Sequence, residues 1–202
     1  MEGPAGEKIT ATAPERRAAL IAEMQRENQR GHHCGACSGV CCTFLANTMQ
    51  ITPLEALDLK DWLNGQGRWN QELRKSLLDC VHRFRLDQDL GDGRRSFRRS
   101  YTCPFYSPGP QGCSISRSYK PYGCLAFNPR SPGRTKGGDC ASNGKLLEDQ
   151  SSPEEELLNQ QLKKAQGLLF DKAPIPVALL ALFSDDSAAG GLLTSESEKL
   201  NF

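Results

Sequence analysis

Apolar side chains recur at helical spacing in four stretches of the chain, and the first two stretches open with the same start signal. Residues 12–15 read Thr-Ala-Pro-Glu, and residues 52–55 read Thr-Pro-Leu-Glu. A Thr followed three residues later by Glu forms a capping box, in which each side chain satisfies a backbone N–H group at the start of a helix. The pattern predicts one helix from Thr12 to Asn28 and a second that ends near Gly65.

The other two stretches each carry a single apolar stripe. Asn70 precedes the third predicted helix, whose stripe consists of Leu73, Leu77, Val81 and Phe84. Ser152 opens the fourth, whose stripe consists of Leu158, Leu162, Ala165 and Leu169. The longest apolar run, at 177–183, is much shorter than the roughly 20 residues that cross a bilayer, so we expect no membrane partner.

The segments between these helices are rich in Gly, Pro and Cys. They cover residues 31–52 and 94–140, with brief strand-like alternation at 44–51 and 97–103. After Asp185 the sequence is rich in Ser, Gly and Glu, and we expect it to fray. These features predict a small, helix-rich α+β domain with an irregular Cys-rich centre, short strands and a C-terminal helix.

Composition adds a reason to expect a bound metal. Only 38% of the 202 residues are hydrophobic, while Gly and Pro number 19 and 12. A domain with so much irregular backbone often needs a disulfide or metal staple. We expect an N-terminal helix or extension at 1–30, a metal-binding domain at 31–145 and a helical tail with a frayed end at 146–202.

The net charge and the N-terminal residues indicate which partners and which cellular location to expect. The net charge of +1 gives no general attraction to nucleic acid or to a membrane surface. The first eight residues contain neither a basic nor an apolar stretch, so they do not predict a signal peptide, and we expect a cytoplasmic protein. In that reducing compartment, nine cysteines favour metal ligands or redox groups over a disulfide framework.

Seven of these cysteines form two groups. The first group is Cys34, Cys37, Cys41 and Cys42, and the second is Cys103, Cys113 and Cys124. Gly35 and Gly39 permit the tight loop that brings neighbouring sulfurs to one ion. The later three cysteines stand among Pro and Gly, so we expect each of them at a turn. We predict that both groups bind at one site, where structural zinc would add folding free energy on the order of 10 kcal/mol.

The order of these motifs resembles a known family. The run C-x2-C-x3-C-C, the Thr-Pro-Leu-Glu at 52–55, and the later Cys-Pro-Phe, Cys-x-Ile and Pro-x-x-Cys are similar to those of the CxxCxxCC family, also called YkgJ-type cysteine cluster proteins. The resemblance spans residues 31–130 and implies a largely bacterial zinc- or iron-chelating domain. The chain departs from the family by one extra residue in the first run. Ser116, Lys120 and Leu125 stand where the family has Tyr, Arg and Arg.

Ligand type leaves the metal open, because zinc, iron and iron–sulfur clusters all accept sets of thiolates. Seven thiols exceed the four positions of one tetrahedral site. They suit either two metals with bridging sulfurs or one four-cysteine site with spare thiols. We expect the chain to bind metal in a structural, storage, delivery or sensing role, rather than to catalyse a reaction.

The alternative function is a redox or cluster-dependent modifying enzyme. Cys34-Gly-Ala-Cys37 resembles a thioredoxin-type dithiol, but that chemistry requires a buried strand before the motif. The segment that precedes Cys34 is polar and predicted to be helical. Metal ligation therefore remains the favoured interpretation.

The remaining candidates are expected to be structural. Cys80 lies on an apolar helical stripe, which predicts a buried thiol that behaves as a small hydrophobe. We expect neither Cys140 nor the tandem His32 and His33 to bind metal, since histidines at a helix end are more often surface residues. The one basic patch combines Arg94, Arg95, Arg98 and Arg99 with Phe97 and Tyr101. We expect it to be a charged strand edge and not a nucleic-acid site.

Overall fold

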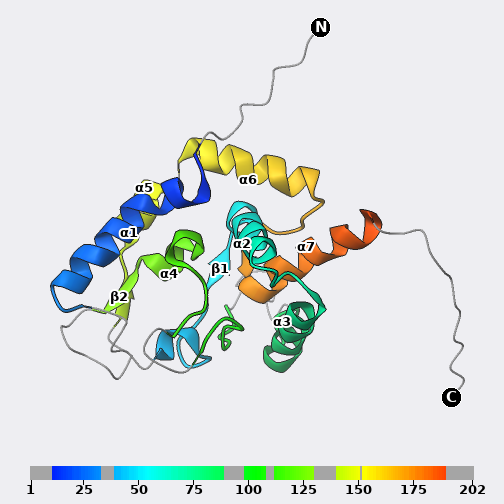
Figure 1. Ribbon diagram of the computed structural model, residues 1–202, viewed down its shortest axis with the longest axis horizontal. Helices are drawn as coiled ribbons and strands as arrows, with labels where there is room; N and C mark the ends of the chain where they lie inside the picture. Colours follow the sequence, from blue (N-terminus) through cyan, green and yellow to red (C-terminus); the bar gives the residue numbers. More distant parts are fainter. Residues whose placement is uncertain are drawn as a thin grey trace, which may run out of the picture.

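The computed structural model describes residues 11–32, 39–88, 98–107, 112–129, 140–150 and 152–189, with the side chains at 149–150 and 184–189 left out. Within these ranges the chain has the predicted helix-rich α+β fold (Figure 1). The helices are α1 (Ala13–Gln29), α2 (Pro53–Gly65), α3 (Gln71–Phe84), α4 (Tyr122–Leu125), α5 (Gly144–Gln150), α6 (Pro153–Ala165) and α7 (Ile175–Ala189). The 3-10 turns are η2 (Val40–Cys42) and η3 (Arg117–Tyr119), and the strands are β1 (Gln50–Ile51), β2 (Phe127–Pro129), β3 (Cys140–Ser142) and β4 (Ala173–Pro174).

The predicted helix starts are confirmed at the level of individual hydrogen bonds. Thr12 and Thr52 each form a complete capping box, with Glu15 and Glu55 respectively. Asn70 caps α3 and Ser152 caps α6 through their side chains. Local side-chain chemistry therefore fixes where these four helices begin.

The end of the fourth helix differs from the prediction. Helix α6 stops at Ala165, and Gly167 follows with a φ of +61°, in the left-handed region that favours glycine. The chain therefore leaves the helical path before Leu169, whose side chain is 97% exposed. Leu169 thus does not belong to the apolar stripe of this helix.

The predicted strands are shorter than the alternation suggests. Of residues 44–51, only β1 is a strand, and it pairs antiparallel with β4 through Gln50 and Pro174. A second antiparallel pair joins β2 and β3. Residues 98–103 run beside the chain that leads into β1, with a hydrogen bond from Tyr101 N to Asn47 O, but they form no strand.

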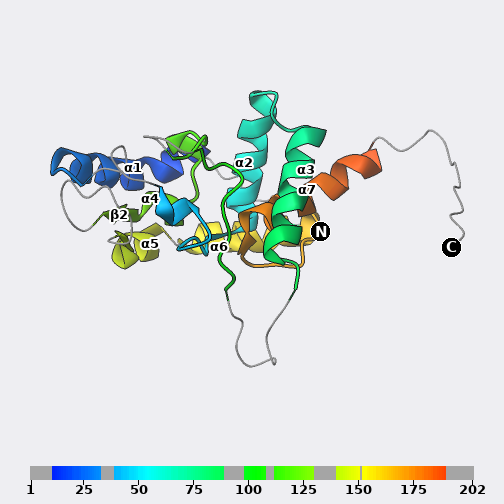
Figure 2. The ribbon, with the colours of Figure 1, turned by 90° about the horizontal axis from the view of Figure 1, so that it is seen from below.

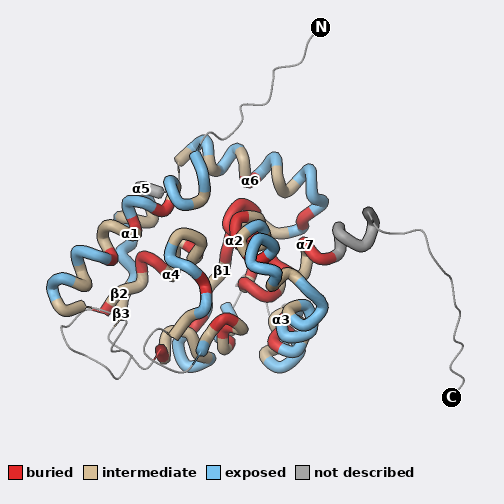
Figure 3. The backbone as a smooth tube through the Cα atoms, viewed as in Figure 1, coloured by how far each residue is buried: buried red, intermediate tan, exposed pale blue. Residues whose placement is uncertain are grey.

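Helix α7 was not predicted, although it lies at the centre of the main hydrophobic core. Figures 1 and 2 show α2, α3 and α7 packed together, and Figure 3 shows buried positions concentrated on α2 and α7. Ile175, Leu179 and Leu182 of α7 are almost fully buried. The apolar run at 177–183 has no polar face, so it lacks the periodic signal by which the other helices were recognised.

A second, smaller core lies between α1 and the end of α4. Leu20 and Met24 of α1 pack here with Leu125 and Ala126, and α5 covers them. The domain boundaries at 30 and 145 stay a prediction. In the described parts of the chain, none of the helices is long and apolar enough to span a membrane.

Tyr101 connects the central segments of the main core. Its ring is fully buried, and its hydroxyl donates to Met49 O (2.7 Å) and accepts from Ile175 N (3.1 Å). One side chain thereby joins the segment before β1 to the first residue of α7. Because its ring faces the core, Tyr101 cannot stack on a nucleic-acid base.

We expect Tyr101→Phe to lower the free energy of unfolding by about 1–3 kcal/mol, since it leaves the buried N–H of Ile175 without its acceptor. Urea unfolding followed by circular dichroism measures this change. Tyr119→Phe is the matched control, because Tyr119 only stacks on Trp62 (5.9 Å between ring centroids) and no hydrogen bond of its hydroxyl is seen among the described residues. Equal stability losses in the two variants would contradict the role of the Tyr101 hydroxyl.

Candidate metal centre

Cysteines from both predicted groups line one cavity of about 720 Å³. Cys41 and Cys42 come from η2, Cys103 and Cys113 from the two sides of the 108–111 gap, and Cys124 from α4. All five carry free thiols. Cys34 and Cys37 lie outside the described residues. Every predicted ligand that the structure describes therefore lines this cavity.

A tight turn positions the thiols of Cys41 and Cys42. Gly39 has a φ of +70°, and a Cβ atom built on it would lie 2.5 Å from the ring of Tyr106, so this position suits glycine alone. The turn is closed by a hydrogen bond from Cys42 N to Gly39 O (2.8 Å). Cys103 N then donates to Cys42 O (2.8 Å), which ties the first group to the second through the backbone.

Two buried side chains hold the segment that carries Cys124. Arg17 of α1 donates from Nε to Lys120 O (2.8 Å), and Glu55 of α2 accepts from Tyr122 N through Oε1 (2.8 Å). At Gly123 an added Cβ would lie 2.7 Å from Met49 Sδ, so the backbone packs closely here. The position of Cys124 thus depends on both α1 and α2.

The Arg17 guanidinium is itself fixed by a buried ion pair. Its side chain is fully buried, and Nη1 lies 2.8 Å from Asp58 Oδ2 on α2. Arg16 pairs with the other oxygen of the same carboxylate. The guanidinium also lies 4.8 Å from the centre of the Tyr122 ring, whose hydroxyl donates to Glu155 Oε1 of α6 (2.8 Å). Four helices are joined by this charged cluster.

Burial and neighbouring charges raise the pKa values of several of these thiols. Burial raises the pKa of the Cys124 thiol well above its usual value, and the neighbouring Cys103 and Cys113 raise it further. Burial likewise raises the pKa of Cys103 to about 12, with a smaller opposing effect from the Lys120 ammonium. For Cys41, the hydrogen bond with the Cys42 thiol is the largest cause of a raised pKa, followed by burial. Without a compensating cation, such thiols stay protonated.

The described thiols do not by themselves form a closed chelate. Among the described residues, no three His, Cys, Asp or Glu side chains lie close enough together to hold a metal ion. The chemistry of the donor set still fits the expected metals, because zinc, iron and iron–sulfur clusters all prefer thiolates. The predicted ligands Cys34 and Cys37 precede η2 directly in the sequence.

The other candidates occupy other environments. Cys80 is buried on α3, as predicted; burial raises its pKa to about 11, and its thiol donates to Thr102 O (3.4 Å). Cys140 lies on β3 and is absent from the cavity lining. His32 Nδ1 lies 2.6 Å from Glu27 Oε2 at the end of α1. His33, Arg94, Arg95 and Phe97 lie outside the described residues.

The site also contains residues that sequence reasoning missed. Glu55 was recognised only as the second member of a capping box, a role that its Oε2 does fulfil toward Thr52 N. Its other oxygen accepts a hydrogen bond from Tyr122 N, which lies 67 residues further along the chain. Nothing in the local sequence around Arg17 indicates that it would be buried, because its partner Asp58 lies 41 residues further along the chain.

No protein-family model, no curated protein and no solved structure matches this chain. The resemblance to the CxxCxxCC family therefore stays a prediction that rests on the cysteine order alone.

We expect Arg17→Met to lower the free energy of unfolding by about 3 kcal/mol, because it removes one partner of a buried ion pair and leaves Lys120 O without its donor. Arg30→Met, just after the end of α1, is the control, since that side chain is 64% exposed and pairs only with Glu27, so its loss should cost less than about 1 kcal/mol. Chemical denaturation of both variants measures the difference. A small, equal effect of both substitutions would show that α1 does not anchor the Cys124 segment.

Proposed function

We propose that the chain binds zinc or iron, as ions or as an iron–sulfur cluster, through a cysteine site shared between distant segments. The proposed ligands are drawn from Cys34, Cys37, Cys41, Cys42, Cys103, Cys113 and Cys124. The observation that carries the proposal is the single cavity into which η2, the 103–113 region and α4 all direct cysteines. Cys103 belongs to the main hydrophobic core and Cys42 and Cys113 pack against it, yet all three also line this cavity.

The energetics of the site support the same proposal. Desolvated thiols are poorly suited to ionise alone, whereas a metal cation stabilises their thiolate forms directly. The Lys120 ammonium lowers the pKa of Cys41, Cys103 and Cys124. It would therefore offset part of the negative charge that a metal carrying several thiolates retains. A cytoplasmic location, which we also propose, would keep the thiols reduced.

The position of the cavity indicates what a bound metal would do for the fold. Met24 of the smaller core and Ile115 and Ile175 of the main core all contribute to its lining. A metal bound here would cross-link irregular segments at the junction of the two cores. The role could be structural, or it could serve metal storage, delivery or sensing.

A second candidate function is cluster-dependent or redox catalysis. The cavity volume of about 720 Å³ favours it, because a closed tetrahedral site leaves no such space beside the metal. A catalytic site, in contrast, keeps one coordination position open toward a pocket of this size. Metal binding is the step that both functions share.

We expect Cys124→Ser and Cys37→Ser to lower bound metal and stability together, because each removes a proposed ligand. Cys80→Ala is the control: it deletes a buried thiol outside the proposed ligand set, so it should cost packing energy of about 1–2 kcal/mol and leave metal content unchanged. Anaerobic purification, mass-spectrometric metal analysis and thermal unfolding provide the measurements.

Equal metal loss in Cys124→Ser and Cys80→Ala would overturn the division between ligand and core cysteines. Unchanged metal content in Cys124→Ser would remove α4 from the proposed site.

A further inference from the structure

Most of the described sulfur-containing residues line the same cavity. Its lining includes both methionines that the structure describes, together with the five thiols: Met24, Met49, Cys41, Cys42, Cys103, Cys113 and Cys124. Of the described cysteines, Cys80 and Cys140 do not line it. Thioethers added to thiolates make a soft donor set, and the softness of its donors decides which metals a site favours.

The thioether of Met49 lies against the segment that carries Cys124. The backbone of Met49 is held on both sides, because its N–H donates to Asn47 Oδ1 (3.0 Å) and its carbonyl accepts from the Tyr101 hydroxyl (2.7 Å). Its side chain reaches Gly123, where an added Cβ would lie 2.7 Å from Sδ and 2.9 Å from Cε. Any other residue at position 123 would therefore displace this thioether from the neighbourhood of a proposed ligand.

The described histidines do not contribute to the cavity. His32 Nδ1 lies 2.6 Å from Glu27 Oε2 at the end of α1, and His82 is exposed on α3. Neither belongs to the cavity lining. Among the described residues, the site therefore lacks the imidazole donors that zinc and copper(II) commonly use beside thiolates.

Two carboxylates of the cavity are bonded to donors of the protein itself. Glu55 accepts from Thr52 N (2.9 Å) through one oxygen and from Tyr122 N (2.8 Å) through the other. Glu155 of α6 accepts from the Tyr122 hydroxyl (2.8 Å). Both carboxylates therefore connect α4 to its neighbouring helices.

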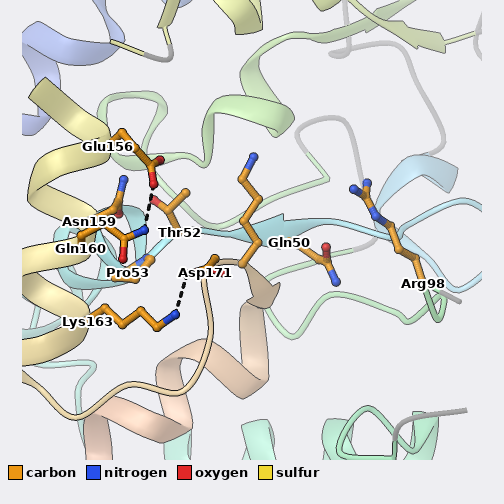
Figure 4. A pocket seen from close by; sticks show the side chains of 10 residues that line it. Gln50, Thr52, Pro53, Arg98, Glu156, Asn159, Gln160, Lys163 and Asp171 are labelled. Atoms are coloured by element: carbon orange, nitrogen blue, oxygen red, sulfur yellow. Dashed lines mark hydrogen bonds and ion pairs between the residues drawn. The ribbon is translucent and has the colours of Figure 1, made fainter. Parts of the chain in front are cut away.

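An adjoining pocket, which shares part of its lining with the cavity, contains oxygen and nitrogen donors but no sulfur. Its described lining includes Glu156, Asn159 and Asp171, and no cysteine or methionine. Figure 4 shows Glu156 bonded to Gln160 (2.9 Å) and Asp171 paired with Lys163 (2.6 Å). The sulfur donors thus all belong to the larger cavity.

We propose that the larger cavity also binds copper(I), with the Met49 thioether as a ligand beside thiolates of the proposed cysteine site. Among the described residues, no three Cys, His, Asp or Glu side chains lie close enough together to hold an ion, so a thioether adds a donor to a set that the thiols leave open. Thiolates and thioethers select copper(I), whereas zinc is bound by Cys, His, Asp and Glu. This inference rests on the proposed cysteine site but not on the choice of zinc or iron there.

Selenium in place of the methionine sulfur tests the contact directly. The full-length protein, labelled with selenomethionine, is loaded anaerobically with copper(I) or with zinc, and X-ray absorption is recorded at the selenium edge. The copper-loaded protein should show a copper neighbour of selenium, and the zinc-loaded protein should show no metal neighbour. Met49→Leu keeps the apolar volume and should abolish the copper signal, whereas Met24→Leu, the same exchange in the smaller core, should preserve it.

Metal affinity gives a second measurement on the same variants. Competition with a chromogenic copper(I) chelator should show binding about tenfold weaker for Met49→Leu, and zinc binding should change by less than about twofold, because zinc does not use the thioether. Equal losses for both metals would indicate a packing role and overturn the proposal. A copper-loaded wild type whose selenium has no copper neighbour would also overturn it, as would loss of the signal in Met24→Leu.

The outcomes separate this inference from the proposed function. Zinc or iron bound by thiolates, without a selenium–copper contact, would remove copper(I) and leave the proposed function standing. A selenium–copper contact in a protein that takes up neither zinc nor iron would do the reverse. A protein that binds none of the three metals would overturn both.

Discussion

The buried pair of Arg17 and Asp58 joins two parts of the molecule that share no hydrophobic core. One core is built on α2, α3 and α7, and the other on α1 and the residues after α4. The guanidinium of Arg17 reaches from the second to the first through Asp58, and it also bonds the carbonyl of Lys120. A buried charge is tolerated only with such partners, so the geometry around it is narrowly determined.

This polar junction explains why the cysteines can gather where they do. Cys103 belongs to the main hydrophobic core, Cys42 and Cys113 pack against that core, and all three also line the cavity at the junction. The Glu55 carboxylate makes two separate contacts: one oxygen caps α2, and the other holds the segment that carries Cys124. The fold thereby directs thiols from distant segments into one space and leaves room beside them.

The parts of the structure that the sequence predicted are those decided over short distances. The capping residues Thr12, Thr52, Asn70 and Ser152 act within one turn, so helix starts were predictable. The cysteines could be recognised as a set from their number and spacing, and their role as metal ligands stays a prediction. The first part of helix α7, in contrast, is apolar on every side up to Phe183 and gave no periodic signal. The role of Arg17 could not be predicted either, because it depends on Asp58 and Lys120, which only the folded chain brings near it.

X-ray absorption at the zinc and iron edges of the anaerobically purified, full-length protein tests the central claim most directly. The measurement reports the element and the atoms around it without any substitution. The account predicts stoichiometric zinc or iron with a coordination shell dominated by sulfur at about 2.3 Å, the distance of zinc–thiolate bonds. A protein that folds without metal, or a metal surrounded only by oxygen and nitrogen, would contradict it.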